Sequence, residues 1–182
     1  MTLEGLAKQG HSNVYDSLVA SIGPKIREIR KEYIKDSFSG FQMVEHRLET
    51  VAIIHGMEFI NDSKSSNINA TWFALENILR PVIWIVGGVE SGNDYSILRH
   101  LVRKNVKGII CLGLDNSRIH EAFDELKLPM VDLVSMDEAV QAAYYMGEKG
   151  DVILLSPACA SFDLFENFEE RGQAFRKAVK NL

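Results

Sequence analysis

The sequence predicts an α/β fold in which a mostly parallel sheet is flanked by helices. Two observations lead to this fold class. Beyond about residue 45, apolar segments of strand length alternate with segments of helical periodicity. Several of the apolar segments are unbroken, which is typical of parallel strands buried on both faces. The 182 residues and 46% hydrophobic content are ordinary for one globular domain.

Residues 1–45 are predicted to form a helical extension that precedes the α/β domain of residues 46–182. Val14, Leu18 and Ile22 share one helical stripe, and Gly23-Pro24 interrupts it where a second helix can begin. Residues 25–32 alternate in charge, which is typical of a helix face in contact with solvent.

The α/β segment is expected to begin with a hairpin formed by strands at 50–54 and 58–60. Asn67 has a side chain suited to capping a helix that ends near Leu79. Further strands are expected at 82–86, 108–112, 130–134 and 152–155. Further helices are expected at 97–103, 118–126 and 137–146, with a terminal helix that ends near Asn181. This order predicts a Rossmann-like sheet wrapped by helices.

Composition and charge exclude several classes of protein. The net charge of −5 gives no overall field that would attract nucleic acid or anionic lipid. The longest apolar run, 82–89, is far shorter than the roughly 20 residues of a membrane helix, and the first residues lack the apolar core of a signal peptide. Cys111 and Cys159 lie in apolar stretches, which indicates reduced thiols. We therefore expect a cytoplasmic protein without nucleic-acid or membrane partners.

A run of seven polar residues, Asn61 to Asn67, follows the predicted hairpin at the start of a helix. In open α/β sheets, ligands bind at the carboxyl ends of the strands, where this run lies. Helix capping alone would explain one such residue, whereas the run adds hydroxyls and Lys64 to the N–H groups of a helix start. The pattern favours an anion site, with simple capping as the alternative.

Two further loops occupy equivalent positions. Residues 87–94 resemble a phosphate loop in glycine spacing, but Asn93-Asp94 stands where Lys-Ser/Thr is required, so we expect a tight turn. In the loop 156–163, Cys159 is interpreted as a buried structural thiol rather than a nucleophile. Ser161 opens a helix there, either as a cap or beside N–H groups that can bind a carboxylate.

The five histidines lack the spacing of metal ligands, so the sequence predicts no metal site. His46 is adjacent to Arg47 and close to Glu49. We interpret it as a hydrogen-bonded residue at a junction rather than as a catalytic base.

Five blocks in this order resemble the C-terminal domain of the D-glutamate-adding Mur ligases, a family of bacterial cell-wall enzymes. The blocks are His46-Arg47-Leu48-Glu49, Asn61-Asp62-Ser63-Lys64-Ser65-Ser66-Asn67, Gly87-Gly88, Ser156-Pro157-Ala158-Cys159-Ala160-Ser161-Phe162-Asp163 and Phe168-Glu169-Glu170-Arg171-Gly172. The resemblance covers about residues 43–182. Residues 12–45 resemble the end of that family's central ATPase domain.

The resemblance implies an ATP-driven amide ligation. The carboxylate of UDP-N-acetylmuramoyl-L-alanine is phosphorylated, and the amine of D-glutamate attacks the acyl phosphate. ATP and Mg²⁺ would be held mainly by the central domain, whose phosphate loop does not occur in this sequence, and neither does the uridine-binding N-terminal domain. We therefore expect a piece of a larger enzyme that binds no metal or cofactor and is inactive by itself.

The resemblance also implies roles for particular residues. Lys64 would be catalytic, near the phosphates and the acyl phosphate. The nucleotide would be bound by Asn13, Arg47, Asp62 and Lys64. D-Glutamate would be held by Ser66, Ser161, Phe162 and Phe168.

Four positions depart from the family pattern, one of them Ser66, where threonine is usual. Ser12 and Asp16 replace the usual histidine and second asparagine near the adenine. Ser91 replaces a lysine that contacts a D-glutamate carboxylate, so we expect weaker capture of the amino acid.

Two other functions are compatible with the residues. The chain could be a stand-alone α/β small-molecule binding module that uses the same cleft. It could also be an ordinary nucleotide-binding domain, although no GxGxxG follows any predicted strand.

Overall fold

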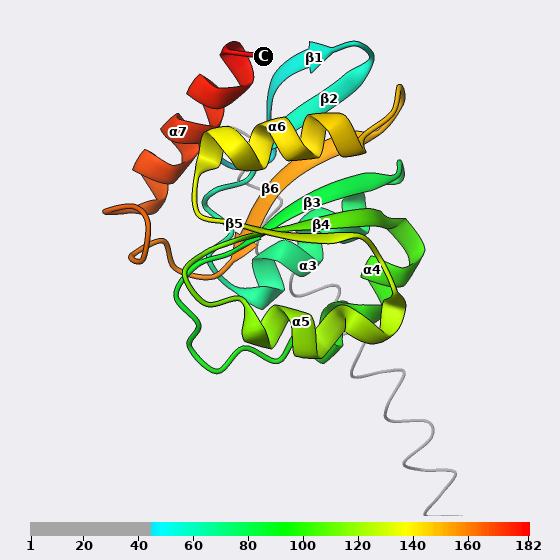
Figure 1. The fold of residues 1–182 in the computed structure, drawn as a ribbon, viewed down its shortest axis with the longest axis vertical. Coiled ribbons are helices and arrows are strands. Elements are labelled where there is room, and N and C mark those ends of the chain that lie inside the picture. The colour runs from blue at the N-terminus through cyan, green and yellow to red at the C-terminus, as the bar shows by residue number, and fades with distance from the viewer. Residues whose placement is uncertain (1–44) are drawn as a thin grey trace, which may run out of the picture. The chain divides into compact units, whose positions relative to one another are not determined.

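The structure, a computed structural model, describes residues 45–182. Asn13, Ser12, Asp16 and the expected helical extension lie outside these residues, and the boundary near residue 45 stays a prediction. The strands are β1 (Glu49–Ile54), β2 (Met57–Asn61), β3 (Val82–Gly87), β4 (Val106–Leu112), β5 (Met130–Leu133) and β6 (Val152–Ala158). The helices are α3 (Ile68–Asn77), α4 (Arg99–Asn105), α5 (Ser117–Phe123), α6 (Met136–Met146) and α7 (Phe168–Lys180), as Figure 1 shows.

The six strands form one sheet in the order β1-β2-β6-β3-β4-β5. Only β1 is antiparallel to its neighbour, and all other pairs are parallel. The predicted α/β class is therefore confirmed. The predicted hairpin is confirmed too, and its two-residue turn places His55 and Gly56 at positive φ (50° and 81°), as a type I′ turn requires.

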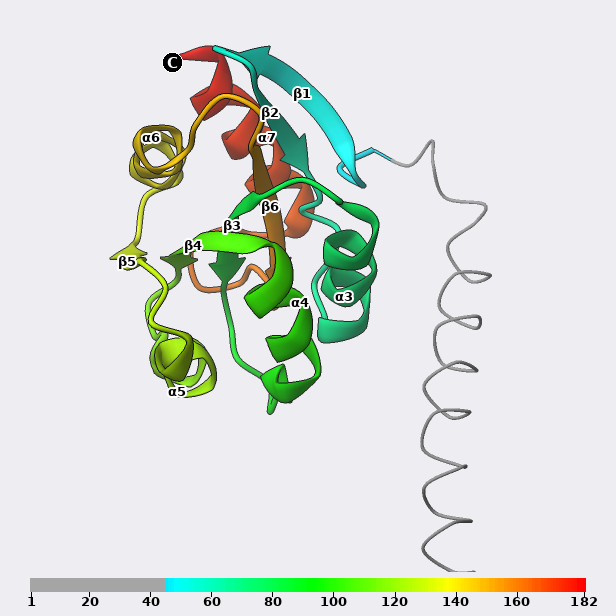
Figure 2. The same cartoon turned by 90° about the vertical axis from the view of Figure 1, so that its right-hand side faces the viewer.

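Helices cover both faces of the sheet, so the parallel strands contribute to two cores. Figures 1 and 2 show α3, α4 and α5 on one face and α6 and α7 on the other. The first core lies under α3, α4 and α5, and the second lies under α6 and α7. Along β3, Val82, Trp84 and Val86 pack into the first core, while Ile83 and Ile85 pack into the second. This alternation explains why the strand is apolar without interruption.

Trp84 links the centre of the sheet to the loop region. Its ring packs edge-on against Phe123, with ring centroids 5.7 Å apart. Its indole N–H donates to the carbonyl oxygen of Ser156 in β6 at 2.8 Å. The same side chain therefore fills the first core and holds the carboxyl end of β6.

The sheet topology creates a crevice at the carboxyl end of β6. The chain leaves β2 for α3 on one face of the sheet, but it leaves β6 for α7 on the opposite face. Adjacent parallel strands whose connections diverge in this way open a binding crevice between their loops. The loops at 61–67 and 158–167 border it. Within residues 45–182, no helix combines the length and the hydropathy that a bilayer crossing requires.

Candidate functional site

The loop 61–67 is fixed to β6 and to the segment before β1 by backbone hydrogen bonds. The N–H of Asp62 donates to the carbonyl of Leu155 at 2.8 Å, and that of Lys64 donates to the carbonyl of His46 at 3.1 Å. At its end, the side chain of Asn67 accepts from the N–H of Ala70 at 3.0 Å. The predicted cap of α3 is thereby confirmed.

His46 is a buried junction residue, as interpreted from the sequence. Its side chain is 1% exposed, and its Nδ1 lies 2.9 Å from the Asn61 amide nitrogen, which also donates to the carbonyl of Gly172 at 3.1 Å. Burial lowers the pKa of His46, and the positive charge of Arg176 lowers it further. A Cβ on Gly172 would lie 2.4 Å from Nδ1 of His46, so this position of α7 requires glycine.

Asp62 is buried, and both of its carboxylate oxygens accept hydrogen bonds from within the protein. Oδ1 accepts from the N–H of Leu48 at 3.3 Å, and Oδ2 accepts from the hydroxyl of Ser156 at 2.8 Å. Burial raises the pKa of Asp62 to about 6, against the opposing effects of nearby hydroxyls and of Arg47. Asp62 therefore ties three segments together and places its charge near Arg47, which is half-buried.

Arg171, on the first turns of α7, is a buried cation that joins two loops. Its guanidinium donates to Ser63 Oγ at 3.1 Å, to the carbonyl of Ser63 at 2.9 Å and to the carbonyl of Cys159 at 3.1 Å. It is 2% exposed, and burial lowers its pKa to about 10. Within residues 45–182, no carboxylate lies within salt-bridge distance of it. Nothing in the sequence predicts this role for Arg171, although the residue lies in the block 168–172.

The loop after β6 is held by both other loops. Ala158 has a left-handed φ of 61°, and its N–H donates to the carbonyl of Ser65 at 2.9 Å. The carbonyl of Ala158 accepts from the Asn93 amide at 3.1 Å. Cys159 is 2% exposed, and burial raises the pKa of its thiol. The expected burial of Cys159 is confirmed, and its purely structural role stays a prediction.

The glycines at the start of the loop 87–94 have positive φ, as expected, and they allow close approach to two neighbours. The loop is longer than the tight turn that the sequence predicts, because seven residues separate β3 from the short helix that begins at Tyr95. A Cβ on Gly87 would lie 2.4 Å from the carbonyl oxygen of Leu112, and one on Gly88 would lie 2.1 Å from that of Ala160. Both glycines have φ near +130°, a region that favours glycine (133° and 132°). The N–H of Val89 then donates to the carbonyl of Ala160 at 2.9 Å.

The structure brings together part of the predicted ligand-binding set. The ammonium of Lys64 lies 5.3 Å from the ring centroid of Phe168, and the hydroxyl of Ser63 donates to the carbonyl of Phe168 at 2.7 Å. The loop 61–67 therefore meets the start of α7. Ser66 is exposed and Ser161 is buried. Contrary to the sequence prediction, Ser161 does not open a helix, because the next helix, α7, begins at Phe168 and is capped by Asn167.

Phe162 is 71% exposed, and Ser91 is exposed as well. The binding roles of all these residues stay predictions.

This arrangement suits the binding of anions. The loop 61–67 and the segment before β1 carry the half-buried cations Arg47 and Lys64, and the same loop exposes the hydroxyl of Ser66. The arrangement does not suit a divalent cation, because the loop's carboxylate, Asp62, is 1% exposed and already uses both oxygens.

Comparison with known proteins identifies what these residues resemble. The family described as "Mur ligase, glutamate ligase domain" matches residues 46–159. A UDP-N-acetylmuramoylalanine–D-glutamate ligase of Christiangramia forsetii is 51% identical over the whole chain, and one of Bacteroides fragilis is 46% identical. The chain spans about 41% of the length of these curated relatives.

Solved structures share the fold. A murein peptide ligase of Psychrobacter arcticus has a TM-score of 0.54 and 16% identity, covering 81% of this chain and 32% of its own. A bifunctional folylpolyglutamate synthase/dihydrofolate synthase of Yersinia pestis has a TM-score of 0.53 and 16% identity, covering 79% of this chain and 33% of its own.

The raised pKa of Asp62 predicts a pH-dependent stability that an amide would remove. Between about pH 4 and pH 6, the unfolded chain releases the Asp62 proton before the folded chain does, because the folded pKa is about 6 and the ordinary value is 3.8. The free energy of unfolding therefore falls with rising pH in this window, by about 3 kcal/mol. In Asp62→Asn this contribution is absent, and the amide can still accept from Leu48.

Urea unfolding of the parent chain and of Asp62→Asn at pH 4, 5, 6 and 7 measures the effect. Comparison at each pH cancels the other titrating groups. We expect the variant to gain stability relative to the parent as the pH rises from 4 to 6. A difference that is constant with pH would contradict the assignment.

Proposed function

Because this chain belongs to the Mur ligase family as a glutamate ligase domain, we propose that it serves an ATP-dependent ligase that adds D-glutamate to UDP-N-acetylmuramoyl-L-alanine. The relatives that match the whole length of this chain are named for this reaction, and their names support the proposal. The geometric observation that carries the proposal is the meeting of Lys64 with Phe168 at the carboxyl edge of the sheet. The reaction would serve the synthesis of peptidoglycan precursors.

In this proposal, residues 46–182 form the D-glutamate-binding domain, and residues 1–45 belong to the end of a central ATPase domain. The phosphate-loop motif GxxxxGK[ST] does not occur in the 182 residues. ATP and Mg²⁺ would therefore be held mainly by residues outside this sequence. The chain alone would not catalyse the ligation. Both cysteines of the described part are free and buried, which supports a reducing, cytoplasmic location.

The proposed chemistry needs a cation beside the transferring phosphoryl group and a positioned amine. Lys64 would stabilise negative charge on the phosphates and on the acyl phosphate. Its ammonium also lies over the Phe168 ring, an arrangement that limits its freedom before substrate binds. Lys64 is half-buried on a loop whose backbone is bonded to His46, so little reorganisation is required when charge develops.

Arg47 would bind the nucleotide at its ribose and phosphates. Asn13, in the preceding segment, would also bind the nucleotide. Asp62 is buried, so we assign it to the nucleotide site through Arg47 rather than through contact with the ligand. Its charge lies near the guanidinium and opposes the loss of the Arg47 proton. The carboxylate thereby supports a cation that would otherwise be disfavoured by burial.

D-Glutamate would be held between the loop 61–67 and the segment after β6. Ser66 is exposed on the first, and Ser161 lies at a turn in the second, where its carbonyl accepts from the N–H of Phe165 at 2.9 Å. Phe162 and Phe168 would pack against the aliphatic part of the amino acid. The hydroxyls of Ser66 and Ser161 would donate hydrogen bonds to the carboxylates of D-glutamate. Such bonds are stronger than those between neutral groups, because the acceptor is charged.

Removal of Lys64 tests the proposed function. In the ligase that contains this chain, we expect ADP release to require both UDP-N-acetylmuramoyl-L-alanine and D-glutamate. Lys64→Ala should lower kcat by about 100-fold or more, because a cation that stabilises developing charge is lost. Lys180→Ala, which removes an exposed lysine at the end of α7, is the matched control and should keep the parent rate. ADP release without a need for D-glutamate, or full activity of Lys64→Ala, would refute the proposal.

Ser91→Lys tests the specificity of the amino-acid site. Ser91 is exposed on the loop after β3, where a longer side chain can extend without a clash. Restoring a cation should lower KM for D-glutamate by about tenfold, as expected for one charge-assisted hydrogen bond. Ser96→Lys, at a nearby exposed position, should leave KM unchanged. An unchanged KM in Ser91→Lys would show that this position does not face the amino acid.

A further inference from the structure

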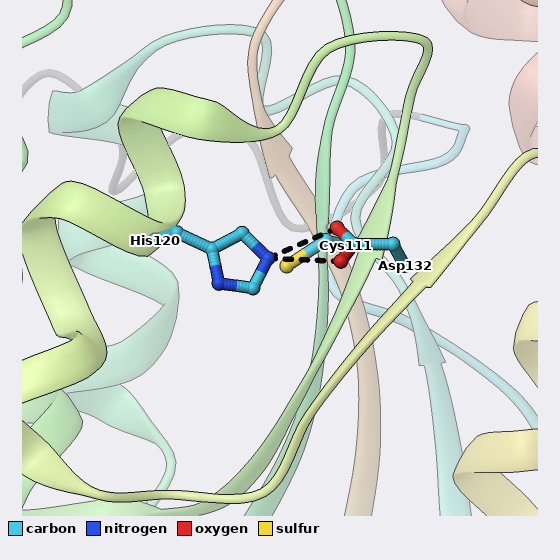
Figure 3. Close-up of side chains that lie close together, drawn as sticks. All are labelled: Cys111, His120 and Asp132. Atoms are coloured by element: carbon cyan, nitrogen blue, oxygen red, sulfur yellow. Dashed lines mark hydrogen bonds and ion pairs between the residues drawn. The ribbon is translucent and has the colours of Figure 1, made fainter.

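Three side chains of metal-ligand type converge away from the proposed ligase site. Cys111 lies near the end of β4, His120 on α5 and Asp132 on β5, and Figure 3 shows them pointing toward one another. One ligand atom of each lies within 4.8 Å of the others. Nε2 of His120 is 2.9 Å and 3.1 Å from the two carboxylate oxygens of Asp132. Sequence spacing gave no signal, because the three residues come from three separate elements.

The orientation of His120 is set by a second carboxylate. Nδ1 of His120 lies 3.2 Å from Oδ1 of Asp124, one turn further along the chain. This contact directs Nε2 toward Cys111 and Asp132. A histidine that binds a metal through one nitrogen commonly donates its other N–H to a carboxylate, which fixes both its tautomer and its ring.

The cluster has a buried end and an open end. Cys111 is fully buried, whereas the side chains of His120 and Asp132 are 32% and 54% exposed. His120 and Asp132 line a hollow of about 530 Å³, together with residues 113–117 at the start of α5. A hydrated ion can therefore reach the histidine and the carboxylate first, and the sulfur last.

We propose that Cys111, His120 and Asp132 form a zinc site with a fourth position open to water. One sulfur, one imidazole nitrogen and one carboxylate oxygen are a donor set that suits Zn²⁺, whereas Mg²⁺ and Ca²⁺ take oxygen ligands. On binding, two protons leave to solvent: the thiol proton of Cys111 and the Nε2 proton that His120 donates to Asp132. The sulfur, Nε2 and one carboxylate oxygen then bind the ion. Donor atoms of a tetrahedral zinc site lie about 3.4 Å apart. The sulfur therefore closes in on the other two ligands, whereas Nε2 and the Asp132 oxygen, now 2.9 Å apart, separate slightly.

A bound ion would tie the edge of the sheet to a helix. β5 is an outer strand that pairs only with β4, and α5 lies between them in the chain. An ion bound to all three elements stabilises the folded chain but not the unfolded one. Its ligands come from β4, α5 and β5, whereas the loops of the proposed amino-acid site follow β2, β3 and β6.

Titration of the metal-free 182-residue chain tests this proposal, with Co²⁺ as the spectroscopic probe and Zn²⁺ as the competitor. We expect one Co²⁺ per chain, with a near-ultraviolet absorption band from sulfur-to-cobalt charge transfer and visible bands typical of tetrahedral coordination. Zn²⁺ should displace Co²⁺ and raise Tm by roughly 4 °C or more at saturating concentration. The absence of stoichiometric binding would refute the site.

Substitutions assign the ligands. Cys111→Ser should abolish the charge-transfer band, and Asp132→Asn should weaken Zn²⁺ binding by about tenfold or more. Asp132 is more than half exposed, so its variant tests the site even where the buried Cys111→Ser affects folding. Cys159→Ser, at the other buried cysteine, and His55→Gln, at an exposed histidine, are matched controls and should bind as the parent does. A charge-transfer band that persists in Cys111→Ser, or binding that is unchanged in Asp132→Asn, would overturn the proposal.

Discussion

The buried guanidinium of Arg171 is the interaction on which the candidate site depends. A cation that is 2% exposed requires acceptors, and Arg171 finds them in the carbonyl and hydroxyl of Ser63 and in the carbonyl of Cys159. These acceptors belong to the loops that follow β2 and β6. An unsatisfied buried charge costs about 3–5 kcal/mol, so neither loop can leave the guanidinium without a large penalty. The helix α7 thereby fixes the geometry of both loops.

Backbone contacts extend this constraint to the third loop. Ala158 bonds to the carbonyl of Ser65 on one side and to the amide of Asn93 on the other. Gly88 permits the approach that lets Val89 donate to the carbonyl of Ala160. The loops after β2, β3 and β6 are distant in sequence but are joined by these contacts. The side chain of Arg171 holds two of them directly, and backbone contacts hold the third. This arrangement presents Lys64 and Phe168 on a rigid support, which is what the proposed phosphoryl and amine chemistry requires.

The sequence predicts what depends on local pattern, and it fails where the property depends on packing between distant segments. Uninterrupted apolar strands and the cap at Asn67 are local, and the structure confirms them. The central place of β6, the last strand in the chain, depends on how parallel strands are ordered, which periodicity does not encode. Arg171 lies in a charged helical turn typical of a solvent face, and its burial follows only from the loops above it. The convergence of Cys111, His120 and Asp132 is likewise visible only in three dimensions.

Amide hydrogen exchange in Arg171→Met tests the central claim most directly, with Lys177→Met on the exposed face of α7 as the control. If the guanidinium holds the two loops, exchange at residues 63–65 and at residues 159–161 accelerates together, by about tenfold or more, since shared hydrogen-bonded support is lost. The core strand β3 should stay protected, and the control should match the parent at both loops. Unchanged exchange at both loops in Arg171→Met, or acceleration at only one of them, would contradict the account.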